Sequence, residues 1–368
     1  MLSRTLGAAA RLFLAAGVLQ IFVFDQYGIP FWISVSLIIA LMLIYTYRGG
    51  IKTLVWTDTF QSAFLLLGVI LSIVAISGEL HLSPSDLIAT VKNSELSKVF
   101  FWDWQPKSFF FKQFFGGMFI AIVMTGLDQN MMQKNLSCKS LGDAQKNMYW
   151  FSVVLILVNL FFLSLGVLLY TYANSKGIAI PAQTDSLFPM LALQHLGNFA
   201  GLVFIVGLTA ATFSSADSVL TTLTTSFYID FLNIEQRPNI TEKQKMAIRK
   251  RIHFGFAFIL LLVILVFKAL NNQAVIDTVF TVAGYTYGPL LGLFGFGLFT
   301  KMQINDKWTP LVCVISPILC FTINTYSTQW FGGYKIGQEL LLLNGTITFF
   351  GLWLLKKNTE IDSLRSEG

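Results

Sequence analysis

The chain has 368 residues, of which 55% are hydrophobic and 12% are charged, and its mean hydropathy is +0.67. Soluble domains carry about 25% charged residues, so this composition excludes an ordinary soluble protein and indicates a polytopic membrane protein. In a membrane protein, a net charge of +6 is explained first by basic residues that collect on one side of the membrane, and only then by binding to a nucleic acid.

Ten apolar segments, each about 20 residues long, predict ten transmembrane helices and therefore an all-α polytopic membrane protein. An even number of spans places both ends of the chain on the same side of the membrane. The predicted spans are residues 6–24, 31–47, 54–76, 109–127, 148–170, 201–228, 253–270, 275–299, 308–325 and 336–355.

The basic residues predict which side that is. Eighteen of the 25 Lys and Arg residues, Arg11 among them, are assigned to one face of this topology and seven to the other. Because basic residues are enriched on the cytoplasmic side, we expect both termini to be cytoplasmic in a cell membrane, plasma or inner. The excess of basic over acidic residues is thus explained by membrane topology, and we expect no nucleic-acid partner.

We expect a single transmembrane domain over residues 1–357 and a short cytoplasmic tail over residues 358–368. In the second outer loop, residues 184–197 have the pattern of a short amphipathic helix capped by Thr184 and Asp185. Such a helix either covers an outer vestibule or lies at the headgroup level of the bilayer.

The most informative stretch is the run of hydroxyls and a carboxylate inside the sixth span. Helical periodicity places four of these positions on one face, namely Ala211, Ser214, Ser215 and Ser218. Asp217 lies beside them and costs about 2.5–3.5 kcal/mol in the middle of a membrane helix, so it requires a partner or a role. Hard oxygen ligands suit Na⁺. The alternative is that these hydroxyls bond to their own helix or join helices together.

Three separated motifs carry a resemblance to a known family. The first runs from Arg48-Gly49-Gly50 through Lys52 and Trp56-Thr57-Asp58 to Gln61. The second is Gly126-Leu127-Asp128-Gln129 with its polar continuation, and the third is Ser214 to Ser218 with Tyr228 and Asp230. In order and spacing they resemble the sodium:solute symporter family, from Ser3 to about Phe299.

The resemblance implies a LeuT-like fold, in which two inverted five-helix repeats surround a site at mid-membrane. It implies one Na⁺ held by the Ala211 carbonyl and by the hydroxyls of Ser214 and Ser215. It further implies a second cation position formed by Asp58 with Ser214, Asp217 and Ser218. For Asp58 an alternative is a carboxylate in the first turns of a helix, where the dipole favours it.

The chain also departs from the family pattern. It begins at what resembles the third core helix, so the first two core helices, which supply half of the ion site, have no counterpart in it. We therefore expect an incomplete sequence, with a core that is only part of the LeuT-like repeat, and no coupled transport by the chain alone.

The polar set that binds sugars in some family members is not visible. The candidates for lining a substrate cavity are Thr125, Asn159, Tyr285, Thr286 and Tyr287. The segment 284–289, Gly-Tyr-Thr-Tyr-Gly-Pro, is predicted to interrupt a helix, as a gate or a binding segment does. The alternative is a proline kink whose tyrosines bond to neighbouring residues.

The function that follows from the resemblance is secondary transport: Na⁺ flow coupled to import of a small organic solute by alternating access, with Na⁺ as coupling ion and no cofactor. No catalytic motif is present, so we expect no enzyme. The remaining alternative is a transporter-like sensory or receptor module without transport. The solute, the Na⁺ stoichiometry and the oligomeric state do not follow from the sequence.

Overall fold

The computed structural model describes residues 1–46, 51–237, 240–270 and 275–356. For a few helical residues, Ser214 and Ser215 among them, the side chain is outside that description, as are the Arg48-Gly49-Gly50 turn and the predicted tail over 358–368.

In the part that is described, seven helices are long and apolar enough to cross a membrane, and three shorter helices are apolar. Together they correspond to the ten predicted spans, which confirms the all-α membrane fold. The helices are α1 (Leu2–Leu19), α2 (Phe31–Thr46), α3 (Ile51–Glu79), α4 (Pro84–Asn93), α5 (Phe110–Ala121), α6 (Gln129–Leu136), α7 (Leu141–Ser175), α8 (Leu187–Gln194), α9 (Gly197–Ser226), α10 (Glu242–Leu270), α11 (Val275–Phe299), α12 (Thr309–Trp330) and α13 (Leu340–Leu354).

Three of these helices end in a wider turn with i→i+5 hydrogen bonds. The turns are η1 (Gln20–Phe24) after α1, η4 (Ile122–Gly126) after α5 and η6 (Phe227–Phe231) after α9. Such turns are rare in ordinary helices and are frequent at functional sites.

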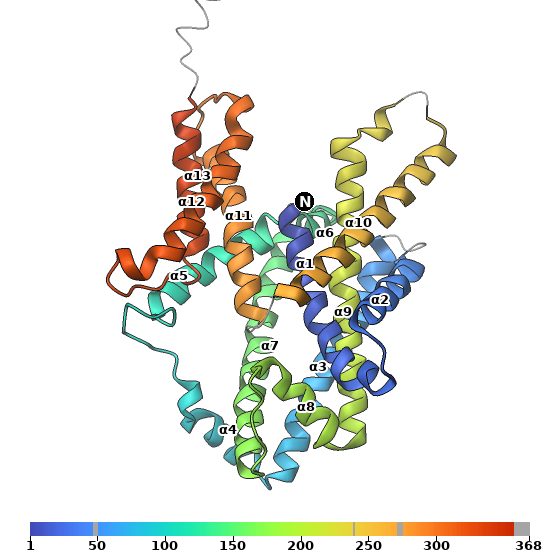
Figure 1. Cartoon of the computed structure of the whole chain (residues 1–368), viewed down its shortest axis with the longest axis vertical. Helices are drawn as coiled ribbons and strands as arrows, with labels where there is room; N and C mark the ends of the chain where they lie inside the picture. The colour runs from blue at the N-terminus through green and yellow to red at the C-terminus, as the bar shows by residue number, and fades with distance from the viewer. Residues whose placement is uncertain (47–50, 238–239, 271–274, 357–368) are drawn as a thin grey trace, which may run out of the picture. The chain divides into compact units, whose positions relative to one another are not determined.

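The chain divides into two compact units (Figure 1). The first comprises Met1–Lys98 and Lys134–Thr278, and the second comprises Val99–Gln133 and Val279–Gly368. Each unit has its own buried apolar clusters, so each is described separately.

The first unit is built around α9. Helices α1, α2 and α10 pack against α9 and against one another. Alanines at positions 8, 9 and 16 of α1 are fully buried in this cluster, because small side chains let helices approach closely. A second cluster joins α3, α7 and α8, and α3 also lies along α9.

The loop segment 184–197 folds as a short turn, η5 (Thr184–Ser186), followed by α8. The helix begins later than predicted, at Leu187, and its N-cap residue is Ser186. Leu187 and Leu191 are buried against the neighbouring helices. The segment therefore packs onto the helices of the first unit, and the covering of an outer vestibule stays a prediction.

In the second unit, α11 and α13 pack through a row of glycines (Figure 1). A Cβ atom on Gly288 would overlap the Asn344 side chain, and one on Gly292 would lie 2.5 Å from Thr348 Cβ and 2.6 Å from the Gly345 carbonyl oxygen. There is thus no room for a larger residue at either position, as in other membrane helices that meet through small residues.

Candidate functional site

The helix that carries the predicted ion ligands, α9, runs unbroken from Gly197 to Ser226. Asp217 is fully buried, and Ser218 is 5% exposed. Ala211 is half-buried. The buried carboxylate therefore lies inside the packed helices of the first unit, where a charge needs compensation.

Four threonines of α9 use their hydroxyls as the alternative for this span predicts, by bonding to their own helix. Thr212, Thr222, Thr224 and Thr225 each donate a hydrogen bond from Oγ1 to the carbonyl four residues earlier, at 2.7–2.9 Å. Their hydroxyls satisfy the helix itself. Hydroxyls inside an apolar span are thus not sufficient to identify an ion site.

Two close backbone contacts define the register of α3 on α9. A Cβ atom on Gly68 would contact the Val203 carbonyl, and one on Gly207, four residues further along α9, would lie 3.2 Å from the carbonyl of Phe64, four residues back along α3. The two helices are therefore antiparallel. Continued for six more residues, this register brings Asp58 level with Phe213, next to Ser214.

The alternative for Asp58 is a carboxylate in the first turns of its helix. The described part of α3 begins at Ile51, and Asp58 lies about two turns further on. The helix dipole is weak at that distance, and both interpretations of Asp58 stay predictions. Asp58 is half-buried.

A pocket of about 340 Å³ lies between α1, α8 and α9 in the first unit. Ala211 and Thr212 of α9 line it from one side and Arg11 of α1 from another. Most of the remaining wall is apolar. The other lining residues are Leu14, Ala15, Val18, Asp185, Phe188, Pro189, Phe204 and Leu208.

Arg11 was counted among the basic residues of one membrane face, although it lies inside the predicted span 6–24. The structure places it on α1, inside the candidate span from Arg4 to Tyr27. Its Nε donates to the Gly7 carbonyl at 3.2 Å. The signal was available in the sequence, because an arginine inside an apolar span is rare and marks a functional site by default.

The five candidates for the substrate cavity are divided between the two units. Asn159, in the first unit, is exposed and its Nδ2 donates to its own helix at the Leu155 carbonyl, 2.8 Å away. In the second unit, Thr125 lies in η4, and Tyr287 is buried in a cluster with Ile120 and Val123. Thr286 donates to the Val282 carbonyl.

The segment 284–289 does not interrupt its helix, contrary to the prediction. α11 continues through Pro289, and the alternative of a tolerated proline is the one observed. The Pro289 nitrogen cannot donate to the Tyr285 carbonyl, so the Asn344 side chain replaces that donor: its Nδ2 lies 2.9 Å from Tyr285 O and 3.0 Å from Gly284 O. The Tyr285 hydroxyl accepts from Asn324 at 2.8 Å.

Comparison with known proteins gives relatives of one kind. The model of the sodium:solute symporter family matches residues 5–307. A sodium/sialic acid symporter of Proteus mirabilis is 24% identical over 87% of this chain and 66% of its own length. A sodium-coupled monocarboxylate transporter of Danio rerio is 26% identical over 75% of this chain and 45% of its own length. The chain thus spans about half to two thirds of these relatives.

A solved structure shows the same fold. It is a Na⁺-coupled sialic acid symporter in a substrate-bound outward-open state, and it superposes with a TM-score of 0.77 over 97% of this chain and 74% of its own, at 19% identity. The relatives are secondary transporters and not enzymes. From the family model and the fold together, the chain belongs to the sodium:solute symporter family.

Proposed function

We propose that this chain takes part in Na⁺-coupled import of a small organic solute that carries a carboxylate. The observation that carries the proposal is the pocket in which Arg11 of α1 and Ala211 of α9 line the same space. Arg11 is exposed and shares the lining of this pocket with Asp185, and a guanidinium binds a carboxylate through two parallel hydrogen bonds.

The relatives support an acidic solute. Sialic acids and monocarboxylates, which appear in the names of two relatives, share the carboxylate and differ in the rest of the molecule. The common requirement is therefore a cation such as Arg11. The apolar lining of the pocket suits the uncharged body of the solute.

The ion positions follow from the sequence motif and the helix register. Ala211, Ser214 and Ser215 are proposed to hold the coupling Na⁺, and Asp58, Asp217 and Ser218 a second cation. Carbonyl and hydroxyl ligands are neutral, so they bind Na⁺ without preventing its release. Thr125, Asn159, Tyr285, Thr286 and Tyr287 remain proposed cavity residues.

Coupling requires that ion and solute favour the same conformation. Because Ala211 borders the solute pocket and belongs to the proposed ion stripe, a Na⁺ ion that fixes this turn of α9 also fixes one wall of the pocket. Each ligand then raises the affinity for the other, as linkage demands, and loss of Na⁺ on the inner side releases the solute. This is alternating access, with both termini proposed to be cytoplasmic.

Uptake by proteoliposomes tests the proposal. The full-length gene product and this chain alone are each purified and reconstituted, and uptake of radiolabelled sialic acid and of a short monocarboxylate is measured with an inward gradient of either Na⁺ or K⁺. We expect the full-length gene product to accumulate an acid with the Na⁺ gradient and not with the K⁺ gradient, and we expect no accumulation by this chain alone. Saturable binding of an acid without Na⁺-driven accumulation would support the sensory alternative, and accumulation of a neutral solute in preference to acids would contradict the role of Arg11.

A further inference from the structure

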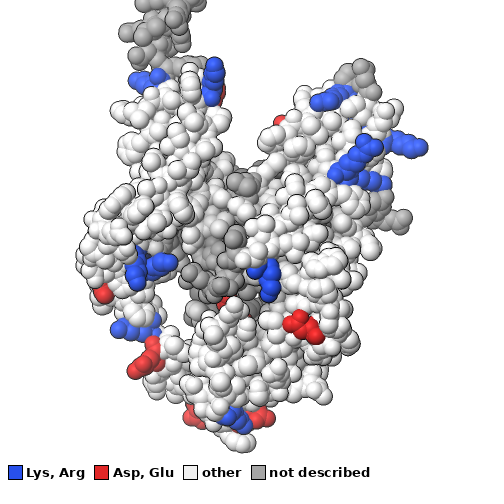
Figure 2. All heavy atoms as spheres, viewed as in Figure 1, with Lys and Arg blue, Asp and Glu red and all other residues white. Residues whose placement is uncertain are grey.

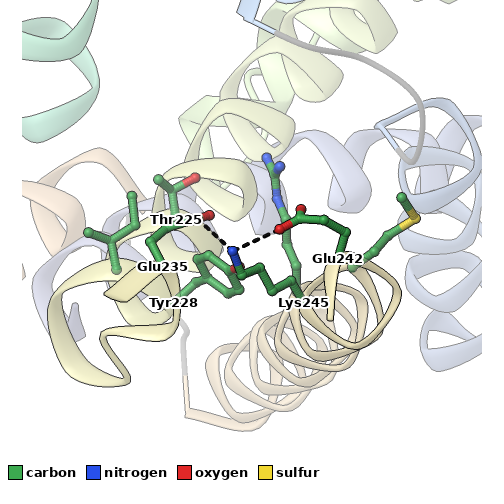
Figure 3. A pocket seen from close by; sticks show the side chains of 8 residues that line it. Thr225, Tyr228, Glu235, Glu242 and Lys245 are labelled. Carbon is green, nitrogen blue, oxygen red and sulfur yellow. Dashed lines mark hydrogen bonds and ion pairs between the residues drawn. The ribbon is translucent and has the colours of Figure 1, made fainter. Parts of the chain in front are cut away.

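A second pocket, of about 280 Å³, lies at the end of the first unit where α9 turns into α10 (Figure 3). It is formed by the last turn of α9, by η6, by η7 (Ile234–Gln236) and by the first turns of α10. The lining residues are Thr225, Tyr228, Ile229, Glu235, Glu242, Lys245, Met246 and Arg249. None of them belongs to the ion or solute positions proposed above.

Lys245 is held in this pocket by two carboxylates (Figure 3). Its Nζ lies 2.8 Å from Glu242 Oε1 and 3.5 Å from Glu235 Oε2. The Lys245 side chain is 17% exposed, whereas Glu235 and Glu242 are 59% and 88% exposed. An ammonium group has three N–H donors, so one remains for a ligand after both carboxylates are bound.

Arg249 follows Lys245 by one helical turn, lines the same pocket and is exposed. The segment 233–251 contains six basic residues and only two acidic ones, Glu235 and Glu242. Lys and Arg side chains gather over this part of the molecule (Figure 2). The basic residues are Arg237, Lys243, Lys245, Arg249, Lys250 and Arg251. The four charged residues that line the pocket balance in formal charge, and Asp230 of η6 adds one further carboxylate nearby. The net attraction for anions therefore comes from the surrounding basic residues.

The pocket also has an apolar side. Ile229 is 46% exposed and Met246 is 60% exposed, and both line the pocket. The apolar stretch of α10, a candidate span, begins at Ile252, directly after the basic residues. The pocket thus lies where a membrane helix leaves the hydrocarbon region, with basic groups and exposed apolar side chains next to each other.

We propose that this pocket binds the phosphate headgroup of an anionic phospholipid. Arg249 donates two hydrogen bonds to the phosphate and Lys245 donates its remaining N–H, while the acyl chains lie against Ile229 and Met246. Glu235 and Glu242 keep Lys245 in position. Basic clusters next to a transmembrane helix attract anionic lipids, and an arginine pairs with phosphate in a fixed geometry.

Lipid titration of the purified protein in detergent tests the site. Native mass spectrometry counts the phosphatidylglycerol and phosphatidylcholine molecules bound to the wild type, to Arg249→Gln and to Lys243→Gln. Lys243 is on the same helix as Arg249, and its replacement by Gln removes the same charge, but Lys243 does not line the pocket. Thermal unfolding without added lipid checks that the variants are folded.

We expect Arg249→Gln to weaken phosphatidylglycerol binding about fivefold or more, Lys243→Gln to leave it nearly unchanged, and phosphatidylcholine to bind poorly throughout. Equal losses in both variants would overturn the proposal, because the attraction would then be diffuse. Displacement of the lipid by millimolar inorganic phosphate would also overturn it, in favour of a site for free phosphate.

Discussion

Two regions of the molecule bring polar groups into apolar helices, and they do so to different ends. In the second unit, Asn344 of α13 is fully buried and donates to two carbonyls of α11, while Ser316 of α12 donates to Asn344. Thr348 donates to the Asn344 carbonyl at 3.0 Å. These polar groups are occupied in joining three helices.

In the first unit, polar groups of α1 and α9 border a cavity instead. Arg11 and Thr212 line the pocket of about 340 Å³, and Asp217 and Ser218 lie one to two turns further along α9. Both regions contain buried amides, hydroxyls or charges in apolar sequence. We therefore propose that access to a cavity distinguishes polar groups that bind a ligand from polar groups that join helices.

Replacement of Arg11 has the largest expected effect. We expect Arg11→Gln to weaken binding of an acidic solute at least about tenfold, because hydrogen bonds to charged groups contribute about 1.5–3 kcal/mol. The dissociation constant of the acid, measured by equilibrium binding in saturating Na⁺, checks this.

Arg11→Lys is the matched control and is expected to retain part of the affinity, since it keeps the charge but not the two-pronged geometry. If the neutral amide of the solute binds as well as the acid to the wild type, Arg11 does not recognise a carboxylate.

The glycines of α11 test the close helix packing of the second unit. A methyl group on Gly288 would overlap Asn344, whereas one on Gly297 of the same helix meets no atom within 4 Å. We expect Gly288→Ala to destabilise the protein by about 1–3 kcal/mol, the usual cost of overpacking. Thermal unfolding in detergent measures it, with Gly297→Ala as control, and Na⁺ affinity is expected to be unchanged in both. Equal melting temperatures would show that α11 and α13 are not closely packed.

Asp58 is expected to contribute a second cation position. Asp58→Asn should raise the Na⁺ concentration for half-maximal uptake about tenfold, equivalent to 1.4 kcal/mol, and lower the steepness of the Na⁺ dependence. A change in stability with an unaltered Na⁺ curve would assign Asp58 to helix packing only.

The smallest effect is expected at Tyr334, in the loop before α13. Its hydroxyl donates to Glu339 at 3.1 Å, and its ring lies 3.4 Å from the Nζ of Lys112. Burial raises the pKa of Tyr334 to about 12, and the nearby Glu339 carboxylate raises it to a smaller extent. The folded state thus holds this proton more tightly than the unfolded state, so stability is lost as pH rises from about 10 through 12.

The loss is checked by melting temperatures of the wild type and of Tyr334→Phe. They are measured between pH 8 and 12, a range that covers the ordinary and the raised pKa of the tyrosine. The phenylalanine variant keeps the ring under Lys112 and is expected to lack this pH dependence. Parallel curves for the two proteins would contradict the buried hydroxyl.

The sequence predicted the helices well because the hydrophobic signal of a membrane span is local and long. All ten apolar helices were predicted, and the hydroxyl stripe of α9 followed from helical periodicity. The Asp58 position required the antiparallel register of α3 on α9, which is set by close contacts at Gly68 and Gly207 and has no local signal.

The errors have physical causes as well. Pro289 was read as a helix break, but the donor that stabilises the helix comes from Asn344, more than fifty residues away in the chain. Arg11 was counted with the basic residues of one membrane face because such residues usually mark membrane faces. Its place in a pocket depends on how α1, α8 and α9 pack, which composition does not predict.

The central claim is that the hydroxyl stripe of α9 binds Na⁺. The most direct measurement is ²²Na⁺ binding to the purified protein by scintillation proximity, comparing the wild type with Ser215→Ala and Thr222→Val. Thr222 is the matched control because its hydroxyl is bonded to the Ser218 carbonyl. We predict that Ser215→Ala weakens Na⁺ binding about tenfold or more while Thr222→Val leaves it unchanged. Equal Na⁺ affinities in all three proteins would contradict the account.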